Sequence, residues 1–276
     1  MTAVHEILAM LPPGAAVLDL GSGAGSFDAG GAALRVVRAD LVAPPRARDN
    51  FVVCSAARLP FADCSFQAVI LNHSLEHFED LEAAIGELAR VVSRTGFVYV
   101  AVPDASTLTD RVYRWLGRGG GHVNLFRDAG ILSGRIAAAT GLRHAGTRVL
   151  CTSLSFLNRR NIRGRPQRKL LLFLNGREGF LRALTFALRR IDRWFHRRTS
   201  VYGWAFYFGD GIRPDRAAWS NVCVGCGSAS PSAALARAGK VRRRRWLPDV
   251  YDCPACGTRN YFTEDGTLSH LTCPGP

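Results

Sequence analysis

The chain has 276 residues, of which 47% are hydrophobic, a length and composition that fit one domain of ordinary size plus an appendage. No uninterrupted apolar run is long enough to cross a bilayer, and residues 2–11 are typical of a short amphipathic helix, not of a secretory signal. The net charge of +14 is uneven, because residues 142–200 hold 15 basic and two acidic residues whereas residues 1–141 are slightly acidic.

The first predicted strand is a buried apolar run that runs into a glycine-rich turn. Asp19 closes this strand, and Gly21, Gly23 and Gly25 alternate through the turn. Glycines between a strand and a following helix let a ligand approach the backbone, and free N–H groups at a helix N-terminus favour an anionic group. A nicotinamide dinucleotide is disfavoured, because Ser26 stands where the G-x-G-x-x-G fingerprint has its third glycine.

The elements that follow alternate in kind. The second predicted strand ends at Asp40, where an acid about 20 residues past the turn can accept hydrogen bonds from ribose hydroxyls. Two prolines at 44–45 predict a loop, not a helix. Further strands are expected over residues 51–54, 67–72, 97–102, 142–151 and 201–208, with helices over residues 81–92 and 131–139. This alternation predicts an α/β fold.

Three motifs carry a family resemblance. The D-x-G-x-G-x-G pattern that begins at Asp19 resembles motif I of the class I S-adenosylmethionine (SAM) methyltransferases. Residues 55–67 resemble the family stretch D-A-x-x-L-P-F-x-D-x-S-F-D, which flanks the adenine of SAM, but depart from it at Ser55 and Gln67. The H-S-L-E-H sequence at 73–77 resembles a turn of the type 11 methyltransferases.

The resemblance covers residues 1–209 and implies both a fold and a cofactor. The implied fold is a three-layer α/β sandwich around a seven-stranded, mostly parallel, Rossmann-like sheet. The implied cofactor is SAM, with its methionine end in the glycine turn and its ribose on the acid at the end of the second strand. The implied SAM-binding residues are Asp19, Gly21, Ser22, Gly23, Gly25, Asp40, Leu41, Ser55, Ala56, Ala57 and Asn72.

Three histidines are candidate catalytic residues. His73 and His77 follow the fourth predicted strand, at the edge of an open α/β sheet where ligands bind. His122 lies in a G-H-x-x-x-F segment that resembles a family stretch before the next helix. Each could orient an acceptor hydroxyl or act as a base. The local alternatives are that Glu76 and His77 cap the next helix, which is favoured, and that His122 only packs a loop. A metal at this turn is disfavoured, because His73 stands where some related enzymes have a glutamate.

Residues 156–200 are predicted to form a basic helical insertion before the last strand. Apolar residues recur at helical spacing from residue 180 to residue 195. Arginines are expected mostly on the opposite face, namely Arg182, Arg189, Arg190, Arg193 and Arg197. A basic amphipathic helix can lie on an anionic membrane, which predicts peripheral membrane contact and a lipid-linked or amphiphilic acceptor. The alternative is a helix packed on the domain with a solvated arginine face.

Two C-x-x-C-G pairs, Cys223 with Cys226 and Cys253 with Cys256, predict a four-thiolate zinc site. Four protein ligands leave no open coordination position, so this zinc is expected to be structural. The site belongs to a linker and zinc-ribbon-like module over residues 210–276, with a core separate from that of the first domain. Cysteines spaced for metal and not for disulfides predict a cytoplasmic protein.

The sequence thus predicts an enzyme, a SAM-dependent methyltransferase with a small-molecule acceptor, and leaves the acceptor and the oligomeric state open. Two alternatives remain. One is an RNA methyltransferase that binds RNA through the zinc module and the arginine run at 242–245, although no N-P-P-Y-type signature follows the fourth strand. The other is a non-catalytic scaffold of the same fold, because Ser55 and Gln67 depart from the family pattern.

Overall fold

A seven-stranded sheet forms the centre of the chain in a computed structural model, which describes residues 4–45, 50–116, 121–154, 157, 177–214, 217–264 and 266–271. The strand order is β3-β2-β1-β4-β5-β7-β6. The strands are β1 Ala16–Leu20, β2 Arg35–Asp40, β3 Phe51–Val53, β4 Phe66–Asn72, β5 Val92–Pro103, β6 His144–Cys151 and β7 Val201–Phe208. All pairs from β3 to β5 are parallel, and β7 runs antiparallel to both β5 and β6. The predicted α/β, mostly parallel fold is confirmed.

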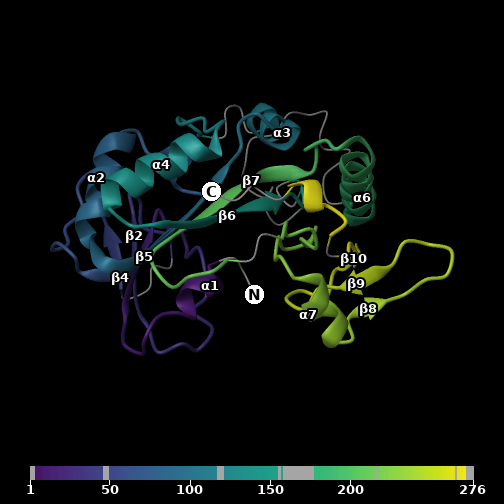
Figure 1. Cartoon of the computed structure of the whole chain (residues 1–276), viewed down its shortest axis with the longest axis horizontal. Helices are drawn as coiled ribbons and strands as arrows, with labels where there is room; N and C mark the ends of the chain where they lie inside the picture. The colour runs from purple at the N-terminus through teal and green to yellow at the C-terminus, as the bar shows by residue number, and fades with distance from the viewer. Residues whose placement is uncertain are drawn as a thin grey trace.

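Helices cover the two faces of the sheet unequally (Figure 1). On one face, α2 (Leu81–Val91) and α4 (Ala129–Thr140) pack apolar side chains on the strands. On the other face, α1 (His5–Leu8) is one turn long, and irregular segments complete the layer. A further helix that the sequence did not predict, α3 (Leu108–Leu116), follows β5. The three-layer arrangement is therefore present, but its second outer layer is thin.

Only a poor helix is expected after the glycine turn, since Gly30 and Gly31 lie in its body, and none forms. Residues 21–34 are all described, and none of them is helical. Gly30 and Gly31 have φ angles of +61° and +82°, left-handed values that a right-handed helix does not contain. The N–H groups of the turn therefore do not lie at the positive end of a helix dipole. Any anion bound there would depend on the backbone of the turn alone.

A buried charge joins the thin layer to the sheet. Arg148 of β6 is fully buried, forms an ion pair with Glu6 of α1, and lies 4.4 Å from the centroid of the Trp219 ring. Buried guanidinium groups are retained when a carboxylate and an aromatic face replace water. Arg148 therefore attaches both α1 and the segment after β7 to the same face of the sheet.

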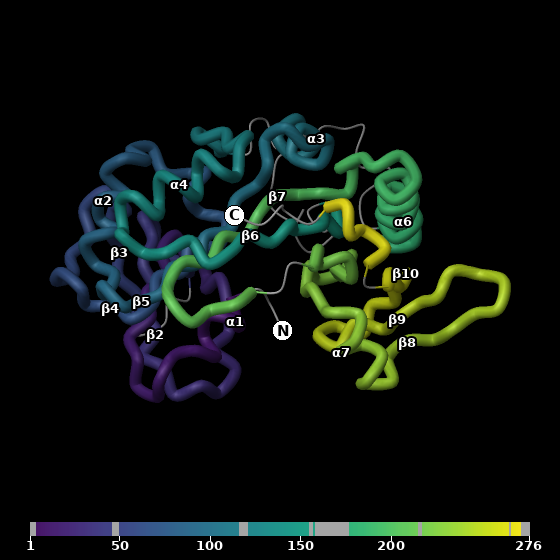
Figure 2. The backbone as a smooth tube through the Cα atoms, viewed as in Figure 1, coloured from purple at the N-terminus to yellow at the C-terminus, as the bar shows by residue number. Residues whose placement is uncertain are grey.

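The C-terminal residues form a small module beside α6 (Figure 2). It contains α7 (Ser232–Arg237) and an antiparallel sheet in the order β10-β9-β8. These strands are β8 Val241–Arg242, β9 Val250–Asp252 and β10 Arg259–Tyr261. The module has its own apolar cluster around Tyr251, but Val222, Leu268 and Leu271 belong to the core of the large sheet. The expectation of fully separate cores is therefore wrong.

Helix α6 (Glu178–Phe195) packs with part of the predicted apolar face, through Leu181, Leu184 and Leu188, and also with polar residues beside it. The buried residues are Leu181, Thr185, Arg189 and Asp192, whereas Trp194 and Phe195 are 67% and 66% exposed. The ring of Phe186 lies 4.8 Å from that of Tyr261 in β10, so the helix contacts the module. Residues 158–176 of the predicted insertion lie outside the described residues. Among the described residues, no helix is both long and apolar enough to span a membrane.

Candidate active site and metal centre

A cavity of about 480 Å³ opens at the carboxyl ends of β1, β2 and β4. This is where the strand order reverses direction, the position at which open α/β sheets bind ligands. Of the predicted residues, those that line the cavity are Gly21, Asp40, Leu41, Ser55, Ala56, Ala57, His73 and His77. The sheet thus brings together side chains from four separate segments of the sequence.

The glycine turn forms one wall of the cavity and is tied to β2. The carboxylate of Asp40 accepts hydrogen bonds from the backbone N–H of Gly23 at 2.7 Å and of Leu41 at 2.7 Å. Gly21 has a φ of +70°, and a Cβ there would lie 2.3 Å from the Cβ of Ser74. A Cβ at Gly23 would meet nothing within 4 Å. Gly21 is therefore needed for packing, whereas Gly23 leaves open space.

Asp19 holds the turn from behind and does not line the cavity. It is fully buried, and its carboxylate accepts hydrogen bonds from the backbone N–H, at 3.0 Å, and the hydroxyl of Ser26. Burial raises the pKa of Asp19, although the Ser26 bonds and the nearby Arg38 oppose the shift. Asn72 donates a hydrogen bond to the carbonyl of the same serine at 3.2 Å. The predicted residues outside the cavity lining are Asp19, Ser22, Gly23, Gly25, Asn72 and His122.

Arg90 of α2 fixes the stretch that resembles the adenine-flanking motif. Its guanidinium donates to the carbonyls of Leu59 and Phe61 at 3.0 and 2.7 Å, and to the carboxylate of Asp63 at 2.8 Å. These bonds hold in place the segment that carries Ser55. The sequence did not single out Arg90, since a lone arginine on a helix has no local signature.

His73 directly follows the C-terminal end of β4 and has a left-handed backbone conformation with a φ of +57°. Its backbone N–H donates to the carbonyl of Ala101 at 2.9 Å, and its ring lies 5.1 Å from that of Tyr202. Burial, together with the nearby His122 and His77, lowers the pKa of His73 to about 4. The imidazole is therefore neutral at pH 7 and is a weak base, suited to accept a hydrogen bond from a substrate.

Glu76 occupies the centre of a polar cluster behind His73. Its side chain is buried, and burial raises its pKa to about 8. Glu76, His77 and His122 each present one possible ligand atom within 4.8 Å of the others. The Nδ1 atoms of the two histidines already face protein oxygens: that of His77 is 2.8 Å from the Gly121 carbonyl, and that of His122 is 3.4 Å from Asp110. These contacts fix the orientation of both rings, and we interpret the cluster as a support for the adjacent His73.

The favoured local role of Glu76 and His77 is not observed. They lie in a 3₁₀ turn, Leu75–His77, and α2 is capped instead by Asp80, which accepts from the N–H of Ala83 at 3.0 Å. Ser74, which the sequence analysis did not select, donates to the carbonyl of Leu20 at 2.9 Å and lines the cavity. Its role depends on the contact between β1 and the turn after β4, which the local sequence does not reveal.

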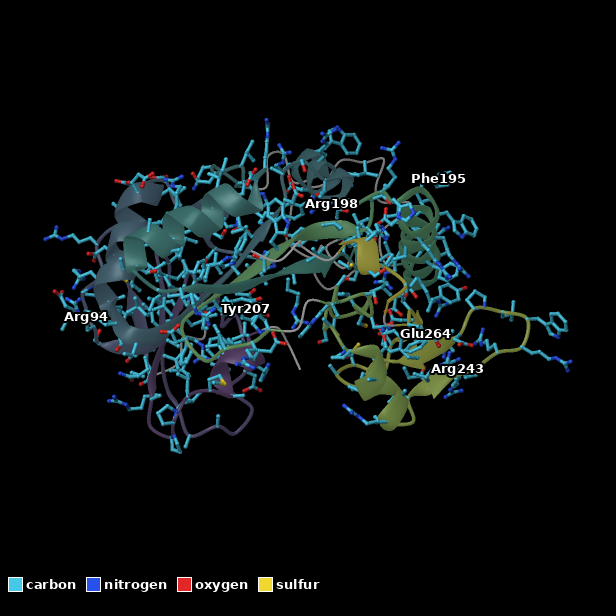
Figure 3. The ribbon with its side chains drawn as sticks, in the orientation of Figure 1. Arg94, Phe195, Arg198, Tyr207, Arg243 and Glu264 are labelled. Atoms are coloured by element: carbon cyan, nitrogen blue, oxygen red, sulfur yellow. The ribbon has the colours of Figure 1, made fainter. Side chains whose placement is uncertain are left out.

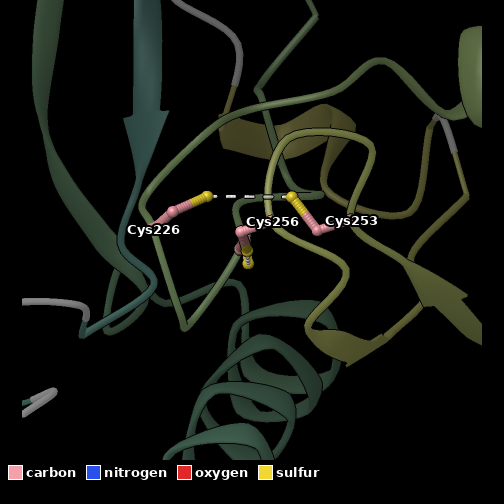
Figure 4. Close-up of side chains that lie close together, drawn as sticks. Cys226, Cys253 and Cys256 are labelled. Carbon is pink, nitrogen blue, oxygen red and sulfur yellow. Dashed lines mark hydrogen bonds between the residues drawn. The ribbon is translucent and has the colours of Figure 1, made fainter.

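The four predicted metal ligands meet in the C-terminal module (Figure 4). The Sγ atoms of Cys226 and Cys253 are 3.7 Å apart, and those of Cys223 and Cys256 are 3.6 Å apart. Ligands at 2.3 Å in a tetrahedron lie about 3.8 Å from one another. Asn260 also donates to the sulfur of Cys223 at 3.3 Å. The donor set and its spacing therefore fit a four-coordinate metal.

Comparisons with known proteins agree with the motif resemblance. Residues 18–100 match a family model described as "Methyltransferase domain". A demethylmenaquinone methyltransferase of Beutenbergia cavernae is 38% identical over 98 residues, which cover 32% of this chain and 41% of that protein. The chain therefore matches less than half the length of this relative.

Two solved structures are similar to this chain at low sequence identity. A SAM-dependent methyltransferase of Archaeoglobus fulgidus is 16% identical, with 71% of this chain and 86% of that chain covered and a TM-score of 0.48. A phosphoethanolamine N-methyltransferase 2 of Haemonchus contortus, in complex with SAM, is 16% identical, with 77% and 53% covered and a TM-score of 0.43. Because both TM-scores are below 0.5, the assignment depends on the strand order and the family match. Residues 18–100 of this chain thus match the kind of methyltransferase domain that the motifs predicted.

Proposed function

We propose that the chain transfers a methyl group from SAM to a small acceptor held beside His73 and His77. The observation that carries the proposal is the cavity whose walls hold both histidines and six of the eleven predicted cofactor residues. SAM, when bound, supplies a methyl group on a sulfonium centre that a nucleophile can attack. The protein then contributes mainly the placement of the two reactants, which can account for a large share of a rate enhancement.

The cofactor half of the cavity has the groups that SAM requires. Each carboxylate oxygen of Asp40 accepts one backbone N–H and keeps a further lone pair for a ribose hydroxyl. Leu41 and Val42 are 69% and 71% exposed at the rim, an apolar surface that suits the face of an adenine. Ser55 is neutral, so it offers the base a hydrogen bond without the charge that the family pattern supplies.

The part of the cavity beside His73 is suited to orienting the methyl acceptor and not to removing its proton. A pKa of about 4 makes His73 a poor match for deprotonating a hydroxyl, whose pKa is far higher. The neutral ring can still accept a hydrogen bond and so direct the acceptor oxygen toward the methyl group. We therefore assign His73 and His77 to acceptor positioning.

SAM binding is tested by isothermal titration calorimetry of Gly23→Arg. The new side chain would fill the open space beside the turn, and we expect SAM binding to fall by at least about 100-fold. Gly14→Arg is the matched control, because Gly14 also has a positive φ and open surroundings but precedes β1, at the other end of the strand. Equal SAM affinity in the two variants would contradict the cofactor site.

We propose a lipid-linked or amphiphilic acceptor and peripheral membrane contact. The matching relative is named for demethylmenaquinone. Besides Trp194 and Phe195 of α6, Trp246 and Leu247 in the loop between β8 and β9 are 86% and 63% exposed. Helix α6 and this loop lie at the same end of the molecule (Figures 1 and 2). Exposed aromatic residues among arginines suit the headgroup region of an anionic bilayer.

Vesicle co-sedimentation tests this contact with the double variant Trp194→Ser and Phe195→Ser. We expect the native chain to sediment with anionic vesicles and the variant to lose most of this binding. Leu108→Ser with Ile131→Ser is the control, because these residues are 51% and 67% exposed on α3 and α4. Labelled SAM supplied to lysate lipids and to RNA then identifies the acceptor class, and label in RNA alone would favour the RNA methyltransferase alternative.

We also propose that the four cysteines bind one structural zinc ion. Thiolates at this spacing select zinc, and four protein ligands leave no position for a substrate. The zinc would stabilise the module against which α6 packs.

A further inference from the structure

A second cavity, of about 330 Å³, lies between α6 and the C-terminal module and is separate from the cavity beside His73. Three of its arginines come from α6, and the fourth comes from the segment after β8. Four arginines and two aromatic residues line this cavity, namely Arg189, Arg190, Arg193, Arg243, Phe186 and Phe262. This concentration of guanidinium groups around a hollow needs an explanation, because like charges repel one another.

Arg189 is the least expected of these residues. It is only 4% exposed, and its Nε and Nη2 atoms have no hydrogen-bond partner among the described residues. The adjacent acid, Asp192, is engaged by the backbone N–H groups of Thr199 and Ser200, at 2.6 and 2.7 Å. Leaving two buried guanidinium nitrogens without partners is costly, so Arg189 would be stabilised by an anion in the cavity that it lines.

The acidic residues of the cavity do not neutralise the three arginines of α6. Arg243 forms ion pairs with Asp249 at 2.7 Å and with Glu264 at 2.6 Å, and Figure 3 labels Arg243 and Glu264 at this site. Arg189, Arg190 and Arg193 form no ion pair with the described residues. The cavity therefore keeps a positive charge that is not matched by its own carboxylates.

Aromatic rings hold two of the guanidinium groups in place. Arg190 lies 5.1 Å from the centroid of the Phe186 ring, and Arg243 lies 5.3 Å from that of Phe262. Such stacking restricts long side chains before a ligand arrives, which lowers the entropy cost of binding. The hydroxyl residues Thr263 and Thr267 also line the cavity and add donors suited to an oxyanion.

We propose that this cavity binds a phosphoryl group, carried either by a soluble phosphate ester or by a lipid headgroup. The planar guanidinium of Arg189 would bind two phosphoryl oxygens, and Arg190 and Arg193 would neutralise the remaining charge. This inference goes beyond the methyl-transfer proposal and does not depend on it, because none of these residues lines the cavity of His73.

The test titrates the full chain with pyrophosphate and with inorganic phosphate, against chloride at matched ionic strength. For the native chain we expect saturable binding of pyrophosphate and a melting temperature raised by about 5 °C at 100 times Kd. Arg189→Gln should weaken this binding by about tenfold or more. The same variant should be no less stable than the native chain without phosphate, because it removes an unpartnered buried charge.

Two further variants keep the test decisive. Arg193→Gln changes an exposed residue of the cavity and should weaken pyrophosphate binding several-fold even if Arg189→Gln fails to fold. Arg94→Gln is the matched control, because Arg94 is exposed at the opposite end of the molecule (Figure 3) and should leave binding unchanged. Binding of pyrophosphate no tighter than that of chloride, or affinity unchanged in both cavity variants, would overturn the proposal.

The source of the phosphoryl group is distinguished by competition with bound pyrophosphate. Glycerol 3-phosphate that displaces pyrophosphate would assign a soluble ester. Displacement only by vesicles containing phosphatidic acid, and not by phosphatidylcholine vesicles, would assign a lipid headgroup. Displacement by none of the three would contradict both sources, and the cavity would then bind only small inorganic ions, against the proposal.

Discussion

The four-cysteine cluster and the cavity beside His73 are built in opposite ways. The cluster is closed: four side chains from two short sequence pairs converge to within 4.8 Å of one another. The cavity is open: backbone, small side chains and two histidines from the ends of separate strands surround about 480 Å³. A closed site supports its own module, whereas an open site depends on the sheet that holds its walls apart. Removing one residue should therefore disrupt the first site and only weaken the second.

The largest effect is expected where the closed site is broken by Cys226→Ser. Structural zinc in small modules contributes about 10–16 kcal/mol of binding free energy, so loss of one thiolate should release the metal and unfold the module. Elemental analysis should fall from one zinc per chain to nearly none. SAM affinity should change little, since every lining residue of the SAM cavity precedes residue 81.

Cys64→Ser is the control for that substitution, because Cys64 is exposed and lies far along the chain from the cluster. It should retain one zinc. The melting temperature of Cys226→Ser should nevertheless fall, because Val222, Leu268 and Leu271 join the module to the main core. Full zinc occupancy in Cys226→Ser would show that the cluster is not the metal site.

A smaller effect is expected from the buried polar residue behind the open site. Because folding raises the pKa of Glu76 from 4.5 to about 8, the folded chain holds a proton that the unfolded chain releases between these pH values. Stability contributed by this group therefore falls as pH rises through that window, by up to about 5 kcal/mol. Glu76→Gln does not titrate, so its advantage over the native chain should grow from pH 5 to pH 8.

Urea unfolding of the two proteins at several pH values measures this difference directly. His73 acts in the opposite direction: its pKa is lowered to about 4, so its contribution to stability rises with pH between about 4 and 6.5. The native curve should thus be flattest below pH 6.5 and should decline above it. Parallel curves for the native chain and Glu76→Gln would mean that this carboxyl group titrates normally.

The smallest effect is expected at the open site itself, from Asp40→Asn. The amide keeps one acceptor for the N–H of Gly23 but loses the charge that favours a ribose hydroxyl, so SAM affinity should fall by about 10- to 100-fold. Asp28→Asn is the control, since Asp28 accepts from the N–H of Gly30 at the exposed end of the same loop and from no other described residue. If calorimetry gives the same SAM affinity for both variants, Asp40 serves the turn and not the cofactor.

The sequence predicted those features that local spacing determines. The strands at residues 67–72 and 201–208 were located within one residue, because each is a continuous apolar run of the length of a buried strand. The poor helix expected after the glycine turn does not form, and Gly30 and Gly31 in its body adopt left-handed conformations instead. Capping of α2 by Glu76 was also wrong, because Asp80 lies closer to the first turn.

The orientation of α6 shows why periodicity alone was insufficient. An apolar stripe predicts the buried face only when the surface that receives it is apolar. Here Thr199 and Ser200 bond to Asp192, and the module contacts the neighbouring face, so polar residues are buried and Trp194 remains exposed. No pattern within the helix specifies these partners, which come from other parts of the chain.

The sequence by itself located the features whose residues lie a few positions apart: the alternating glycines of the turn, the acid that ends the second strand, and the two cysteine pairs. Each follows from backbone geometry over one turn or one strand, which is local. Only the tertiary structure decided that His73 lines the cavity while His122 does not, and that two buried nitrogens of Arg189 have no hydrogen-bond partner among the described residues. Those outcomes depend on segments tens of residues apart, which only the packing of the sheet and helices brings together.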